Sequence, residues 1–165
     1  MTFAVAKRQH VVKRAARTPQ GDAFSLLAIT TLRLAGHLTL AGDTLAEPAG
    51  QSSARWQVLA GARAGAHSVA EMARILGVSR QGVQRLADVL EKEGLIAYAE
   101  NPRHRRAKLV ALTADGAARL GEIEMRQAKW ADALGTDFTV AEMARAQALM
   151  AKVIAALARE KTEAD

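Results

Sequence analysis

The residues of this sequence best suited to binding chemistry form two groups of basic and amide side chains. The first group lies at the start of the segment 80–92: Arg80, Gln81, Gln84 and Arg85. The second group follows Pro102: Arg103, His104, Arg105, Arg106 and Lys108. In a DNA major groove, Arg can pair bidentately with guanine and Gln with adenine. Arginines at a loop tip can reach a phosphate or a narrow minor groove.

The segment 80–92 is predicted to be a helix that buries one face and exposes the other. Ser79 is a suitable N-cap, and apolar residues recur at helical spacing: Val83, Leu86, Ala87 and Leu90. Gly82 leaves room for the protein backbone to approach DNA closely, and the helix N-terminus attracts phosphate. We therefore expect Ser79 and Gly82 to belong to the same binding surface as the basic and amide residues.

Another helix is predicted directly before this one, and a hairpin directly after it. Ser68 and Glu71 have the spacing of a capping box, and the helix that they begin should stop at Gly77. The segments 95–100 and 107–112 are short and apolar, as expected for two strands around the basic loop. Helix, tight turn, helix and basic hairpin in this order define a winged helix–turn–helix.

The flanking sequence is predicted to be helical. Candidate N-caps are Ser53 for a helix over 54–63, Thr113 for one that ends near Leu134, and Thr139 for the last helix. A long helix is also predicted over 22–46. The fold class is therefore mainly α with a small β-hairpin wing. The expected parts are a basic tail, an N-terminal helix, a winged core and C-terminal helices: 1–20, 21–50, 51–112 and 113–165.

The composition of the chain indicates one class of partner and excludes several kinds of site. The chain has 165 residues, which suits one domain, and a net charge of +6 with a pI of about 10.2. Residues 1–20 carry five basic side chains and no acidic one, so a polyanion is the first partner to consider. The absence of cysteine excludes disulfides, thiolate zinc sites and thiol-based redox sensing. No uninterrupted apolar run approaches the ~18 residues of a membrane span, so we expect a cytoplasmic protein without a membrane partner.

Other candidate sites are weaker. No Ser/His/Asp set, phosphate loop or metal-binding His pair is present, so neither an enzyme nor a metal or other cofactor is expected. His37 is a partly buried polar residue or faces an effector pocket. Trp56 is expected to be a packing residue that could also line such a pocket, and Trp130 lies at a dimer interface or lines the pocket.

The stretch 55–120 resembles the multiple antibiotic resistance regulator (MarR) family of winged-helix proteins. The matching segments are RWQVLAGARAG, VAEMARILGVSRQGVQRLADVLEKEGLI and NPRHRRAKLVALTADGAARL. The resemblance implies a bacterial homodimeric transcription regulator, more often a repressor than an activator, that binds a pseudo-palindromic operator in double-stranded DNA. It also implies that the helix after Ser79 reads DNA, that Arg106 enters a minor groove, and that a small aromatic or phenolic ligand releases the protein.

One residue departs from the family pattern. The family usually has an Asp two positions before the wing arginine, where this sequence has His104. A neutral imidazole cannot replace a carboxylate as the ionic partner of that arginine. We therefore expect a looser wing, and we expect His104→Asp to bind DNA at least as tightly as the wild type.

Two other functions remain open on the residues alone. One is a winged helix that binds protein, with the basic tail as a docking arm. The other is an architectural DNA-binding protein with little sequence preference. The ratio of specific to non-specific DNA affinity separates these functions from a regulator, which should prefer its site by ~10³-fold or more.

Overall fold

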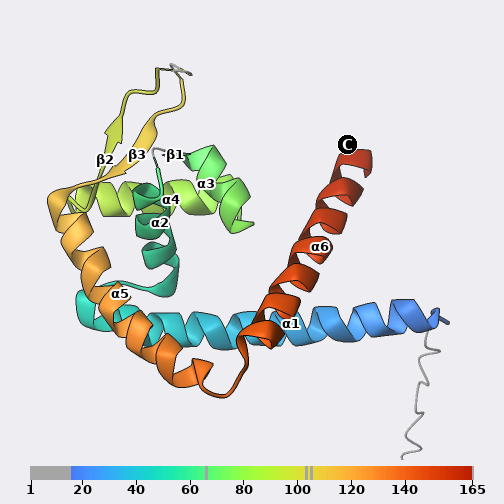
Figure 1. Cartoon of the computed structure of the whole chain (residues 1–165). Helices are drawn as coiled ribbons and strands as arrows, with labels where there is room; N and C mark the ends of the chain where they lie inside the picture. The colour runs from blue at the N-terminus through green and yellow to red at the C-terminus, as the bar shows by residue number, and fades with distance from the viewer. Residues whose placement is uncertain (1–15, 66, 103, 105, 165) are drawn as a thin grey trace, which may run out of the picture. The chain divides into compact units, whose positions relative to one another are not determined.

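The computed structural model describes residues 16–65, 67–102, 104 and 106–164 (Figure 1). Its elements in chain order are α1 (Pro19–Ala46), the 3₁₀ helix η1 (Glu47–Ala49), α2 (Ser53–Arg63), β1 (His67–Ser68), α3 (Val69–Leu76), α4 (Arg80–Lys92), β2 (Ile96–Ala99), β3 (Leu109–Leu112), α5 (Ala114–Gly135) and α6 (Val140–Ala164). The chain divides after Thr39 into two compact units, so α1 contributes to both. The mainly helical class with a small antiparallel sheet is confirmed.

The part of α1 in the first unit is apolar and exposed. Leu26 is 67% exposed and Leu32 is 74% exposed. The hydroxyls of Thr30, Thr31 and Thr39 each donate to the carbonyl four residues earlier, over 2.9 Å. These bonds satisfy the hydroxyls within the helix and reduce the polarity that it presents to its surroundings.

By length and composition, Pro19–Ala49 is a helical stretch that could cross a membrane, with a mean hydropathy of 1.4. The expectation made from the sequence did not identify this stretch as a candidate span. It counted only uninterrupted apolar runs, whereas this stretch interleaves apolar residues with threonines and glycines and has few charges. The core helix of a non-membrane protein passes the same test, although none of the 18-residue window that meets it is buried in the described part of the chain.

Local capping explains where the helices of the second unit begin. The Ser68 hydroxyl accepts from the Glu71 backbone, and the Glu71 carboxylate accepts from Ser68 N–H over 2.7 Å, so the predicted capping box is confirmed. The helix α2 is capped by Ser52 and not by Ser53, which is its first residue. The Ser52 side chain accepts from Arg55 N–H over 3.3 Å, while Ser53 donates its own N–H to Asp43.

The sheet is antiparallel and has the order β1-β3-β2. In β3, Val110 lies opposite His67 of β1 and Tyr98 of β2. The hairpin of β2 and β3 agrees with the prediction, but β1 was not foreseen. A strand of two residues has no alternation to detect and exists here only because β3 pairs with it.

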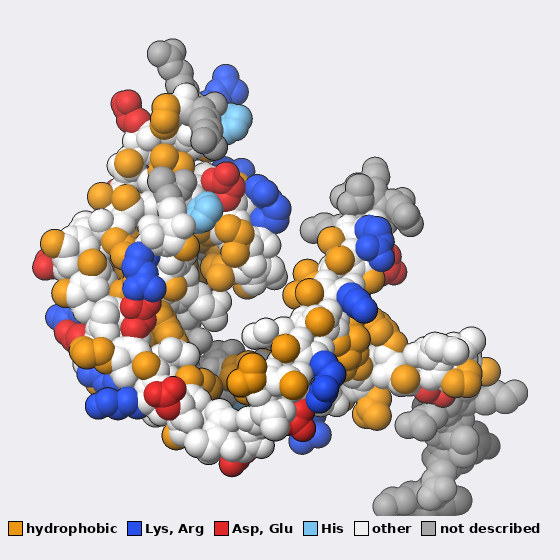
Figure 2. Space-filling view, in the orientation of Figure 1, with side chains coloured by type: hydrophobic (Ala, Val, Ile, Leu, Met, Phe, Trp, Pro, Cys, Tyr) orange, Lys and Arg blue, Asp and Glu red, His pale blue; other side chains and the backbone are white. Residues whose placement is uncertain are grey.

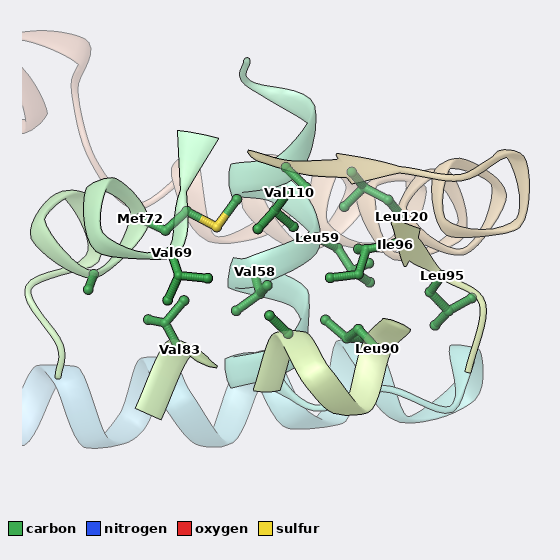
Figure 3. Close-up of a cluster of buried hydrophobic side chains, with 13 residues drawn as sticks. Val58, Leu59, Val69, Met72, Val83, Leu90, Leu95, Ile96, Val110 and Leu120 are labelled. Carbon is green, nitrogen blue, oxygen red and sulfur yellow. The ribbon is translucent and has the colours of Figure 1, made fainter. Parts of the chain in front are cut away.

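The winged-helix part encloses one principal core (Figure 3). Side chains from α2, α3, α4, α5 and the sheet meet there, and nine of them are less than 2% exposed in the chain as a whole. The labelled members include Leu59, Met72, Leu90, Val110 and Leu120. A smaller cluster of Ala46, Ala49 and Ile123 lies between the end of α1, η1 and α5. Burial on this scale positions α4 against its own domain and leaves its opposite face exposed.

The last two helices begin as predicted at Thr113 and Thr139. The Thr113 hydroxyl accepts from Gly116 N–H over 3.0 Å, and the Glu142 carboxylate accepts from Thr139 N–H over 2.8 Å. In α6, large apolar side chains are exposed, as the orange surface in Figure 2 illustrates: Val140, Met143, Leu149, Met150, Ile154 and Leu157. The described part of the chain leaves these side chains of α6 exposed.

Candidate nucleic-acid interface

The first turn of α4 presents exposed polar side chains above a buried apolar face. The Ser79 hydroxyl accepts from Gly82 N–H over 3.1 Å and begins the helix. Arg80, Gln81 and Arg85 are exposed, whereas Val83 is 1% exposed. A Cβ on Gly82 would lie 3.0 Å from Ser79 Oγ, so this glycine also makes room for the cap. The N-terminus of α4 is therefore an accessible positive end of a helix dipole.

A groove of roughly 420 Å³ lies beside this turn. Its walls come from α4, from the start of α3, from β2 and from the segment that leads into β3. Three basic side chains line it: Arg80, Arg106 and Lys108. Glu91 also lines the groove. The groove therefore joins the two groups of basic residues that are separate in the sequence, and its positive charge suits an anion.

Gln84 lines the same groove but is already hydrogen bonded. Its Nε2 donates to Asp88 Oδ1 over 2.7 Å and to Tyr98 Oη over 2.8 Å. The Tyr98 hydroxyl in turn donates to Asp88 Oδ1 over 2.8 Å. Burial, with the Asp88 carboxylate as second cause, raises the pKa of the Tyr98 hydroxyl to about 12. Neither Tyr98 nor Asp88 was identified from the sequence as a binding residue, because neither belongs to a recognisable motif.

The hairpin tip contains two backbone turns in its described part. His104 N–H donates to the carbonyl of Asn101 over 3.2 Å, and Ala107 N–H donates to the carbonyl of His104 over 2.9 Å. His104, Arg106 and Lys108 are exposed. Arg103 and Arg105, which were also predicted to contact DNA, lie outside the described residues. The looser wing expected from His104 stays a prediction.

The residues proposed for an effector pocket occupy three helices. His37 is exposed on α1 in the first unit. In the second unit, Trp56 is half-buried in α2 and packs against both apolar clusters, and Trp130 is half-buried in α5. The packing role of Trp56 is thus confirmed. Within the described part of the chain, no three His, Asp or Glu side chains are grouped so that they could hold a metal ion.

Comparison with known proteins agrees with this architecture. Residues 52–107 match the model of the MarR family. An uncharacterized protein of Mycobacterium tuberculosis is 41% identical over 95 residues, which are 58% of this chain and 66% of that protein. The transcriptional activatory protein BadR of Rhodopseudomonas palustris is 32% identical over 112 residues, 63% of this chain and 64% of BadR. The chain thus spans just under two thirds of the length of these relatives.

Solved structures share the fold. CouR from Rhodococcus jostii bound to p-coumaroyl-CoA superimposes with a TM-score of 0.69 at 21% identity, over 84% of this chain and 95% of CouR. The repressor CouR bound to a 23-mer DNA duplex gives a TM-score of 0.65 at 23% identity, over 85% and 99% of the two chains. The fold and the groove define a winged helix–turn–helix protein. The winged-helix segment 52–107 belongs to the MarR family.

Proposed function

We propose that this protein is a transcription regulator that binds double-stranded DNA through α4 and the β2–β3 wing. The observation that carries the proposal is the groove in which Arg80, Arg106 and Lys108 converge beside the N-terminus of α4. Phosphate contacts from Arg and Lys supply most non-specific affinity, and side chains of a recognition helix add base selectivity. Arg80, Gln81 and Arg85 occupy the exposed first turns from which a recognition helix reaches bases.

The second part of the proposal is a homodimer formed through the flanking helices. Large apolar side chains are exposed on α1 and on α6, among them Leu32, Leu38, Leu149 and Ile154. Exposed apolar side chains gathered along a helix usually mark an interface. A second copy that covers it would also present two α4 helices to major grooves about one turn, or ~10 bp, apart. The operator would then be a pseudo-palindrome. The measurement is sedimentation equilibrium, in which a monomer at micromolar concentration would contradict the dimer.

We further infer repression that a small molecule relieves. The support is the structural neighbour CouR, which is described both as a repressor on a DNA duplex and in complex with p-coumaroyl-CoA. A ligand relieves repression only if it binds the DNA-free and DNA-bound conformations with different affinity. Phenolic acids and their CoA thioesters are the probes to test. The supporting result is a ligand-dependent rise in the Kd for DNA.

The decisive experiment is fluorescence anisotropy with the intergenic DNA upstream of this protein's own gene and with an unrelated duplex, at two salt concentrations. The regulator requires tight binding that prefers the upstream DNA by ~10³-fold. Equal and salt-sensitive binding to both duplexes would instead indicate an architectural DNA-binding protein. Binding to neither duplex would favour a protein-interaction module.

A further inference from the structure

The amide group of Gln84 is held in one orientation by two neighbours. A glutamine amide has two N–H hydrogens and one carbonyl oxygen, Oε1. Its N–H groups are directed at these two neighbours, because Nε2 donates to Asp88 Oδ1 and to Tyr98 Oη. The reverse orientation would place Oε1 against the Asp88 carboxylate, which only accepts. Charge on Asp88 therefore fixes which end of the amide remains available.

The phenol of Tyr98 completes this arrangement. Its hydrogen is donated to Asp88 Oδ1, so its lone pair is left to accept from Gln84. Tyr98 comes from β2, whereas Asp88 and Gln84 lie one turn apart on α4. The wing strand thus restrains a side chain of the helix that faces the groove. Oε1 of Gln84 receives no hydrogen bond from the part of the chain that the structure describes, although Gln84 is partly exposed and lines the groove.

We propose that Tyr98 and Asp88 are positioning residues that make Gln84 a pure hydrogen-bond acceptor, which reads the exocyclic amino group of adenine or cytosine in the major groove. The inference rests on the proposed DNA-binding function and gives it a specificity determinant. Among major-groove edges, only adenine N6 and cytosine N4 are donors. Guanine and thymine offer no donor there, and a phosphate oxygen would face Oε1 as a second acceptor.

This contact differs from the usual pairing of glutamine with adenine. The usual pair is bidentate and needs a glutamine N–H for adenine N7 as well as the carbonyl for N6. In the proposed contact, the N–H groups of Gln84 stay directed at Asp88 and Tyr98, so only the carbonyl faces the base. Gln81 is exposed, and its amide has no hydrogen bond among the described residues, so it keeps the bidentate option.

The test begins with selection from a random duplex library by the wild-type chain and by the variants Gln84→Ala, Tyr98→Phe and Gln81→Ala. We expect Gln84→Ala to lose the preference for adenine or cytosine at one position in each half-site. Gln81→Ala serves as the matched control and should change a different position. An unchanged selected sequence for Gln84→Ala would overturn the inference. Failure of the wild type to enrich any sequence would overturn the proposed function and the inference together.

The second step uses base analogues at the Gln84-dependent position and requires only the wild-type chain. If adenine is selected, replacement by purine, which lacks the amino group, should weaken binding about tenfold, as expected for one lost hydrogen bond. Replacement by 7-deazaadenine, which lacks N7, should leave the Kd unchanged. If cytosine is selected, pyrimidin-2-one provides the amino-free analogue. A loss of affinity with 7-deazaadenine, or none without the amino group, would contradict the acceptor role.

Tyr98→Phe then separates positioning from a merely structural role. Removing the phenol frees one N–H of Gln84, so the variant should become sensitive to 7-deazaadenine at the same position. Its preferences elsewhere in the half-site and its circular dichroism spectrum should match the wild type. Insensitivity of the folded variant to 7-deazaadenine would show that Tyr98 does not position Gln84.

Discussion

The carboxylate of Asp43 in α1 accepts a hydrogen bond from the backbone N–H of Ser53 in α2 over 2.7 Å. The N–H groups of the first turn of a helix have no partner within the helix, and a carboxylate there also suits the helix dipole. One side chain from the preceding helix therefore completes the N-terminus that Ser52 caps only in part. This bond ties the end of α1 to the first helix of the winged core.

We predict that Asp43→Ala lowers the free energy of unfolding by about 1–2 kcal/mol, the range for loss of a helix cap. Thr44→Ala is the neighbouring control, because the Thr44 hydroxyl bonds only to a carbonyl of its own helix. Urea denaturation followed by circular dichroism measures both. Equal stability of the wild type and Asp43→Ala would show that the bond contributes nothing.

Two glycines of α5 should respond in opposite ways to alanine. A Cβ on Gly116 would lie 1.8 Å from the carbonyl oxygen of Leu95, which is backbone and cannot move aside cheaply. Gly116→Ala should therefore destabilise the fold by about 3 kcal/mol or prevent folding. A Cβ on Gly121 meets nothing within 4 Å, so Gly121→Ala should stabilise the helix by up to about 1 kcal/mol. Thermal melts compare the melting temperatures of the two variants with that of the wild type. Similar changes in both variants would contradict the close packing of α5 on Leu95.

The single tyrosine of the chain allows its ionisation to be followed without ambiguity. The absorbance of tyrosinate should rise near pH 12 and not near 10, because burial and the Asp88 carboxylate disfavour the charged phenolate. The contribution of the neutral Tyr98 phenol to the free energy of unfolding is thus fully present below pH 10. It is lost as the pH rises through about 12. Asp88→Asn should lower the pKa of Tyr98 without restoring the usual value, since burial is the larger cause. An unchanged titration in that variant would contradict the bond to Asp88.

The capping box of α3 should make stability depend on pH in acid. Hydrogen bonds from the backbone and side chain of Ser68 lower the pKa of Glu71 below 4.5. The stabilisation is thus present above that value and is lost as the pH falls through the lowered pKa. Glu71→Gln should be less stable than the wild type at pH 7, and the difference should shrink at pH 3. The control is Glu100→Gln, because Glu100 is exposed. If the difference in the free energy of unfolding between Glu71→Gln and the wild type does not depend on pH, the Glu71 carboxylate does not stabilise the helix.

Arg106 should contribute to DNA affinity mainly through charge. Arg106→Ala is expected to weaken binding at all sites and to reduce the slope of log Kd against log salt by about 1. Lys152→Ala removes an equal charge from an exposed position of α6 that does not line the groove, so its slope should be unchanged. Anisotropy titrations at several salt concentrations provide the slopes. If the slope of log Kd against log salt is the same for both variants, Arg106 does not contact DNA phosphates.

Features that join residues near in sequence were predictable. The bounds of α4, the capping box of Ser68 and Glu71, and the caps at Thr113 and Thr139 agree with the structure. Each depends on hydrogen bonds between residues three or four apart, together with an apolar spacing that one helix displays by itself. The choice of Ser52 over Ser53 was missed, because adjacent serines have equal local suitability and only Asp43 distinguishes them.

The order of the long helices and of the hairpin, the helix that we propose reads DNA, and the resemblance to the MarR family could all be inferred from the sequence. Which polar groups of that helix remain available to a ligand depends on its packing against the wing. Gln84 and Tyr98 are fourteen residues apart, and their hydrogen bond exists because the hairpin folds back along α4. The same packing created β1 and brought Arg80 together with Arg106 at one groove. Contacts across such separations depend on how helices and sheet pack around the shared core, which no local pattern encodes.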